Sequence, residues 1–210
     1  MKLFGSVCFY ILAFGIAGYA AFAYGFMPLG SLVHPDMTLN FLAHKTGIYL
    51  HVFASLIALS LSPFQFSGWL RTTRPRLHRF IGRIYLIGVT LGGLSGLYMS
   101  TLAFCGLVAK LGFACLAVCW LLTGLRAFQT IRRGVVQEHR KWVVRNVSLT
   151  LAAVTLRIYL PSSMIVGIPF EIAYPVIAWL SWVPNLLVAE WMLTGTYRNL
   201  SQPQAFRGSA

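Results

Sequence analysis

Ionisable side chains inside long apolar stretches are the residues of this chain most able to do chemistry. His51 and Arg157 lie within two such stretches, and a rise of about 1.5 Å per helical residue puts them at similar depths in the outer leaflet. Charged groups inside a bilayer are expensive, so they are functional candidates by default. We therefore predict one polar outer site around His51 and Arg157, with Glu171, Tyr49 and Tyr159 as possible neighbours. In the alternative interpretation, Arg157 extends past Tyr159 to the lipid headgroups.

A second candidate cluster consists of two His-Arg pairs that each precede an apolar stretch, with a further arginine about one turn later. Its members are His78, Arg79, Arg83, His139, Arg140 and Arg145. Neutral imidazole is the form that ligates a metal, while helix N-termini and guanidinium groups suit carboxylates or phosphates. The pairs therefore predict an inner site for a metal-containing or anionic group. The cluster is also compatible with a role in topology and in binding anionic headgroups.

Three further polar residues could face these sites. Pro63 ends the second apolar stretch and leaves Gln65 able to face the inner cluster. Glu190, about one turn from the inner end of the last stretch, could pair with the inner arginines. Pro184 breaks that stretch beside Asn185, which would free backbone carbonyls for a ligand or an ion.

A stripe of small residues runs along the third apolar stretch. Gly88, Gly92 and Gly96 repeat every four residues and therefore share one helical face. Such a stripe permits close contact between two helices, which is its commoner role. It would also permit a flat macrocycle to lie against the backbone.

The composition indicates that these residues are positioned by membrane-spanning elements. The chain has 210 residues, of which 58% are hydrophobic and 10% are charged. Soluble chains carry roughly a quarter charged residues, so this composition excludes a soluble globular domain. Six apolar stretches are long enough to cross a hydrocarbon core of about 30 Å. They are residues 3–26, 46–66, 84–104, 107–128, 146–162 and 172–194.

These stretches predict an all-α integral membrane protein. We expect a single bundle of six transmembrane helices over residues 1–197 and a short polar tail at residues 198–210. A transmembrane strand barrel is excluded because the stretches are uniformly apolar and do not alternate. The connection after the first stretch carries His34, which we expect to be mobile and solvated.

The basic residues predict the orientation of this bundle. Of the 17 Lys and Arg, 14 lie on one side, in the connections after the second and fourth stretches and at the two ends of the chain. The positive-inside rule then places both termini in the cytoplasm. Because topology accounts for these residues, the net charge of +13 does not indicate a nucleic-acid partner. The first stretch also fits a secretory signal, but we expect it to be retained as a helix.

Three motifs carry a resemblance to a known family. They are PFQF at residues 63–66, HRFIGRIY at residues 78–85 and HRKWVVR at residues 139–145. Over residues 44–194 the chain resembles a bacterial family of multi-span predicted membrane proteins of unknown function, loosely similar to cytochrome b561-like bundles. The resemblance implies a bacterial inner-membrane protein and no established activity. The matching positions are His51, Pro63, Gln65, His78, Arg79, Gly82, Arg83, His139, Arg140, Arg145 and Arg157.

Three functions remain open from the sequence. The first is a haem b-binding redox protein, in which His78 and His139 ligate an inner haem, His51 an outer one, and arginines hold the propionates. The second is an enzyme or binding protein for a quinone, an isoprenoid or a lipid intermediate, with Arg157 and His51 among its polar contacts. The third is an accessory subunit or assembly factor of a membrane complex. The expected partners are the lipid bilayer and a quinone or another membrane redox protein.

Overall fold

The computed structural model describes residues 3–201, and it describes side chains for residues 5–35 and 37–195. Within this part all regular secondary structure is helical, and there are no strands. The helices are α1 (Leu3–Gly25), α2 (Thr38–Ala43), α3 (Lys45–Leu61), α4 (Gly68–Thr73), α5 (Pro75–Ser100), α6 (Gly106–Arg132), α7 (Val136–Thr150), α8 (Ala152–Ile165), α9 (Phe170–Leu180) and α10 (Val183–Ser201). Short 3-10 turns occupy Pro35–Met37 and Pro63–Phe66.

Six membrane-spanning segments account for most of these helices, which confirms the predicted all-α transmembrane bundle. Four spans are the single helices α1, α3, α5 and α6, with α3 extended by the turn at Pro63–Phe66. The fifth span combines α7 and α8, and the sixth combines α9 and α10. The expected tail at residues 198–210 begins inside α10, and its part from residue 202 lies outside the described residues.

Several spans begin earlier than the apolar stretches do. The third was expected from residue 84, but α5 begins at Pro75, and the fifth was expected from residue 146, but α7 begins at Val136. Proline is favoured at the first position of a helix, and arginine is a good helix former. The basic segments therefore continue the helices beyond the apolar core, so that His78 and His139 lie in the first turns of α5 and α7.

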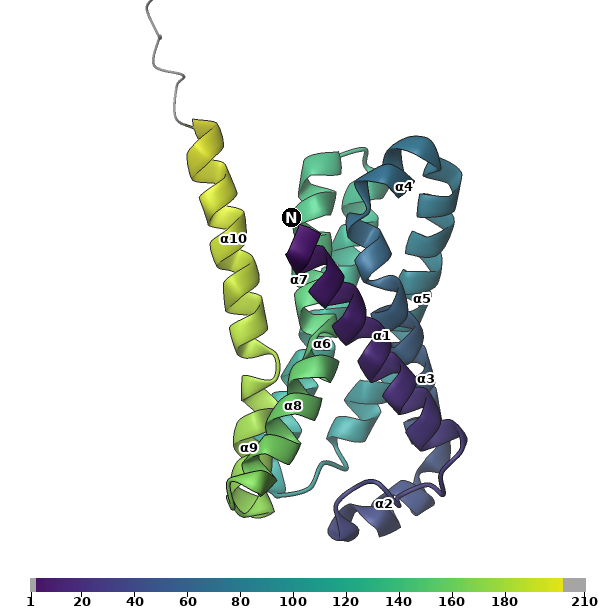
Figure 1. Cartoon of the computed structure of the whole chain (residues 1–210), viewed down its shortest axis with the longest axis vertical. Helices are drawn as coiled ribbons and strands as arrows, with labels where there is room; N and C mark the ends of the chain where they lie inside the picture. The colour runs from purple at the N-terminus through teal and green to yellow at the C-terminus, as the bar shows by residue number, and fades with distance from the viewer. Residues whose placement is uncertain (1–2, 202–210) are drawn as a thin grey trace, which may run out of the picture.

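The two ends of the bundle differ in charge. We call the end at which α4 and the turn between α6 and α7 lie the basic end, because it carries Arg71, Arg76, Arg79, Arg132 and Arg140. The opposite end carries α2 and the turn between α8 and α9 (Figure 1). In Figure 1, α1 begins and α10 ends toward the basic end, as an even number of spans requires.

The glycine stripe of α5 serves helix packing. A Cβ atom added at Gly88 would lie 2.9 Å from the backbone carbonyl oxygen of Ala54 in α3. A Cβ atom at Gly92 would meet the Ser55 hydroxyl at 2.8 Å and the Trp120 ring at 3.1 Å. These close approaches leave α5 in contact with α3 and α6 along the stripe. At Gly88 and Gly92 the space expected for a macrocycle is therefore occupied by protein.

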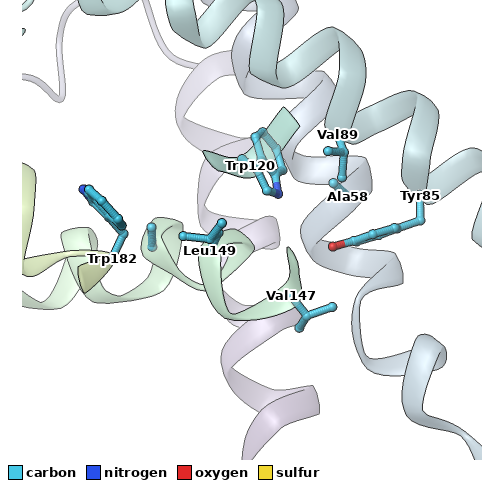
Figure 2. Packing of buried hydrophobic residues seen from close by; sticks show 8 residues of the cluster. Ala58, Tyr85, Val89, Trp120, Val147, Leu149 and Trp182 are labelled. Atoms are coloured by element: carbon cyan, nitrogen blue, oxygen red, sulfur yellow. The ribbon is translucent and has the colours of Figure 1, made fainter. Parts of the chain in front are cut away.

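Figure 2 shows buried hydrophobic residues of the apolar core that joins α5, α6 and α7. A polar network lies inside this core. Asn146 is fully buried and accepts a hydrogen bond from the Tyr85 hydroxyl at 2.6 Å. Its amide donates to the Trp120 carbonyl and the Thr123 hydroxyl, each at 2.8 Å. The Trp120 indole N–H donates to the Thr150 hydroxyl at 2.9 Å. Because buried polar groups are costly unless they are paired, this network specifies how the three helices meet.

Candidate intramembrane binding site

A cavity of about 850 Å³ lies inside the bundle, and it extends from the middle of the spans toward the opposite end. It is lined by α1, α3, α5, α6, α7, α8 and α9 and by the connection between α1 and α3, residues 26–44. Most of the lining side chains are apolar, such as Leu56, Leu116 and Leu156. Ligand-binding pockets commonly have volumes of about 300 to 1,000 Å³, so this cavity can hold a small organic molecule.

His51 and Arg157, which the sequence places at similar depth, both line this cavity. His51 lies in the second turn of α3, and its Nδ1 atom is 2.8 Å from the Gly92 carbonyl oxygen on α5. A carbonyl oxygen only accepts hydrogen bonds, so Nδ1 carries the proton. In the neutral ring, Nε2 is then an acceptor that a bound molecule can use.

Arg157 lies near the middle of α8, and one of its N–H groups donates to the Ala153 carbonyl of its own helix at 3.0 Å. Tyr24 of α1 lines the same cavity as Arg157 and His51. Among the described side chains Arg157 forms no ion pair. The guanidinium group therefore brings a positive charge and unused N–H donors into an apolar cavity.

The connection between α1 and α3 covers the cavity at the opposite end. Gly30, His34 and Phe41 from this segment line it. The His34 imidazole stacks on the Phe170 ring of α9, with centroids 4.0 Å apart and an interplanar angle of 6°. His34 was expected to be mobile and solvated; in the structure it is half-buried and packs on Phe170, so it is not fully solvated.

Glu171, an expected neighbour of Arg157, does not line the cavity. It is exposed in the first turn of α9, whereas Phe170 and Tyr174, one turn apart, face inward. Successive helical residues differ in direction by about 100°, so Glu171 turns away when Phe170 and Tyr174 face the bundle.

Asn185 lies at the break between α9 and α10 that Pro184 predicts. The Asn185 amide donates to the Ser181 carbonyl at 3.0 Å, and the Thr155 hydroxyl of α8 donates to the same oxygen. The carbonyl exposed by this break is therefore satisfied by the protein. Asn185 and Thr155 tie the broken sixth span to α8 at the level of the cavity.

The structure brings the two inner histidines together at the basic end. His78 and His139 are close enough for their charges to interact, and Arg71 also acts on His78. The Nδ1 atom of His139 is 2.8 Å from the Ala127 carbonyl oxygen of α6, and the Nδ1 atom of His78 is buried without a hydrogen bond in the described chain. Gln65 lies nearby, since its Oε1 atom would be 3.5 Å from a Cβ atom at Gly82, one turn after His78.

The inner arginines divide into one paired residue and several exposed ones. Arg145 forms a two-point ion pair with Glu190 of α10, at 2.5 and 2.9 Å, and stacks over the Trp142 ring at 4.7 Å. This pair joins α7 to α10. Arg79, Arg83 and Arg140 are exposed and, within the described part of the chain, form no ion pair.

Two residues of this region were missed from the sequence. Tyr24 contributes a phenol to the cavity, and Asn146 organises the polar network beside it. A polar side chain within an apolar stretch was the available signal for Asn146. Tyr24 lies near the end of the first stretch, where aromatic residues are typical of the membrane interface and indicate no site.

Taken together, the six spans define a multi-pass helical membrane protein with a cavity between its helices. The family described as "Predicted membrane protein (DUF2306)" matches residues 48–193. The match covers more than half of the chain, which therefore belongs to this family of membrane proteins of unknown function. No curated protein and no solved structure matches the chain, so the expected similarity to cytochrome b561-like proteins receives no support.

Proposed function

We propose that the protein binds an amphipathic, membrane-soluble molecule in this cavity, with the polar head of the molecule on Arg157 and His51. A quinone, an isoprenoid or a lipid intermediate has the required combination of a polar head and an apolar body. The observation that carries the proposal is the Arg157 side chain, which lines an apolar cavity and has no ion-pair partner among the described side chains.

The energetics of Arg157 support a bound ligand. An arginine at the centre of a membrane helix costs about 2.5 to 3.5 kcal/mol on insertion scales, and such residues usually face a partner or a polar cavity. Arg157 is held by one hydrogen bond to its own helix, which does not compensate its charge. A ligand with a polar head would supply that compensation and would use the remaining N–H donors.

The architecture around the cavity also supports this function. The fifth span is interrupted between Thr150 and Ala152, and the sixth between Leu180 and Val183. Thr150 and Ser181, at these two interruptions, both line the cavity. Broken helices at mid-membrane depth are common in membrane proteins that bind a ligand inside the bundle.

A cavity-filling substitution tests this proposal. Leu156→Trp adds bulk to a side chain that lines the cavity, so it is expected to reduce the co-purifying amphiphile to less than about a fifth of the native amount, by steric exclusion. The measurement is quantitative mass spectrometry of lipids extracted from the purified protein. Leu122→Trp, at an exposed position on α6, is the matched control and should leave the amount unchanged. Equal amounts of co-purifying amphiphile in the native protein and in both variants would contradict the proposal.

A haem b-binding redox function is a second candidate, favoured by one specific observation. His51 and His139 each direct Nδ1 at a backbone carbonyl, which leaves Nε2 free, and metal-ligating histidines commonly have this arrangement. Met99 and His34 share the cavity with His51 and could supply a second ligand. The described residues contain no group of three metal-binding side chains. A haem iron, however, requires only one or two axial ligands from the protein.

An absorption spectrum separates the two candidates. A haem protein expressed with ample haem supply is expected to show a Soret band that His51→Ala or His139→Ala weakens or shifts, because an axial ligand is lost. The spectrum is recorded on purified protein, oxidised and reduced, with His44→Ala as the control, since His44 bonds to Tyr98 outside the cavity. A colourless native preparation would eliminate this candidate and leave the amphiphile-binding function.

The orientation is part of the proposal. We place the basic end in the cytoplasm of a bacterial inner membrane, because positive residues are retained on the cytoplasmic side. The cavity then lies toward the outer leaflet. A reporter enzyme that is active only outside the cytoplasm should be silent when fused after α10, and an active reporter there would reverse the orientation.

A further inference from the structure

We propose that the polar head of the bound molecule is an anionic oxygen group, a carboxylate or a phosphate, rather than the neutral head of a quinone or an alcohol. This inference rests on the proposed function and specifies its ligand. The charges around the cavity and the directions of the available hydrogen bonds carry it.

The first step is the balance of charge. Glu138 pairs with Lys141 and Glu190 pairs with Arg145, both outside the cavity, and Glu171 is exposed on α9. No described carboxylate therefore lies against Arg157. A neutral ligand could accept hydrogen bonds from the guanidinium group but would leave its charge uncompensated in an apolar surrounding. An anionic head both accepts the hydrogen bonds and balances the charge.

The second step is the geometry of the donors. Arg157 uses one Nη1–H group on the Ala153 carbonyl, so its Nε and second Nη atoms have no partner in the described chain. Arg157 is partly exposed and lines the cavity, and neither of these atoms is among the buried polar atoms that lack a hydrogen bond in the described chain. A planar guanidinium group with two adjacent free donors matches the two oxygens of a carboxylate or phosphate.

The third step concerns the groups beside Arg157. Tyr24 also lines the cavity, and its phenol is a hydrogen-bond donor that an anionic head can use. His51, whose Nδ1–H group donates to the Gly92 carbonyl, can accept a hydrogen bond at Nε2 from a hydroxyl or from a singly protonated phosphate. A phosphate monoester satisfies all three groups, whereas a carboxylate satisfies Arg157 and Tyr24 and leaves His51 for a further hydroxyl.

Three probes with apolar chains of nearly equal length test the inference on the full-length protein in phosphatidylcholine nanodiscs. Hexadecyl phosphate and palmitate carry the anionic heads, and hexadecanol is the uncharged match. Native mass spectrometry measures the occupancy per chain at increasing probe concentration. We expect at least one anionic probe to bind about 10- to 100-fold more tightly than hexadecanol, the range of a charge-assisted hydrogen bond. The ratio of the affinities for the two anionic probes shows whether the site prefers a phosphate or a carboxylate.

Substitutions at Arg157 complete the test. Arg157→Gln is expected to abolish the anionic preference, Arg157→Lys to retain part of it, and Arg126→Gln, exposed near the end of α6, to leave it intact. Equal binding of hexadecanol and the anionic probes to the native protein would overturn the inference, while the proposed cavity would stand. No binding of any probe, together with no effect of Leu156→Trp on the bound lipids, would instead overturn the proposed function.

Discussion

Replacing Arg157 by leucine is expected to abolish retention of the amphiphile and, at the same time, to stabilise the empty protein. The first effect follows because the contact for the polar head is lost, and the second because an uncompensated charge leaves an apolar cavity. We expect the free energy of unfolding of the ligand-stripped protein to rise by about 1 to 3 kcal/mol. Titration with a denaturing detergent measures this change, and lipid mass spectrometry on the unstripped protein measures the retained ligand.

The control for this prediction is Arg126→Leu, which removes a positive charge from an exposed position at the basic end of α6. It should change the free energy of unfolding by no more than about 0.5 kcal/mol, as is usual for surface substitutions, and it should leave the amount of retained ligand unchanged. If Arg157→Leu lowers the stability of the stripped protein, Arg157 has a structural role. In that case its guanidinium group reaches the headgroups, as in the alternative interpretation of the sequence.

Replacing Asn146 by leucine is expected to have the largest effect on stability in the chain. Asn146 is fully buried and joins Tyr85, Trp120 and Thr123. Without the Asn146 amide, the Tyr85 hydroxyl loses an acceptor and the Thr123 hydroxyl loses a donor. The leucine side chain must also fit into a filled site. A loss of about 3 to 5 kcal/mol is expected, because several buried polar groups lose their partners together.

The free energy of unfolding in mixed micelles measures this loss. Gln137→Leu on the same helix, at an exposed position, is the matched control and should have little effect. A loss below about 1 kcal/mol for Asn146→Leu would mean that the network is not needed to hold α5, α6 and α7 together. The cavity above it would then lack the rigid base that Trp120 and Thr150 provide.

The spans could be predicted from the sequence because the bilayer imposes a length and a composition on each of them. The helix ends could not be predicted, because the basic segments contain no residue that would end the helix that begins at Pro75. The shared depth of His51 and Arg157 followed from counting residues along two spans of opposite direction. Depth alone did not reveal whether their side chains would share a cavity, because that depends on the rotation of each helix.

Other features of the site depend on contacts that no local pattern specifies. The stacking of His34 on Phe170 joins residues that are distant in the sequence, so the folded connection over the cavity had no signal near either residue. The break at Pro184 was expected to free backbone carbonyl groups, yet the Ser181 carbonyl accepts hydrogen bonds from the Asn185 amide and from the Thr155 hydroxyl of α8. Glu190 could be paired with an inner arginine from the sequence, since the chain offers so few acids, and Arg145 is that partner.

The most direct measurement is an experimental density map of the protein purified with its own lipids. The account predicts elongated density within the cavity, with its polar end within hydrogen-bonding distance of the Arg157 guanidinium group and of Nε2 of His51. A cavity closed by side chains, or an Arg157 side chain turned out to the headgroups with no density beside His51, would contradict it.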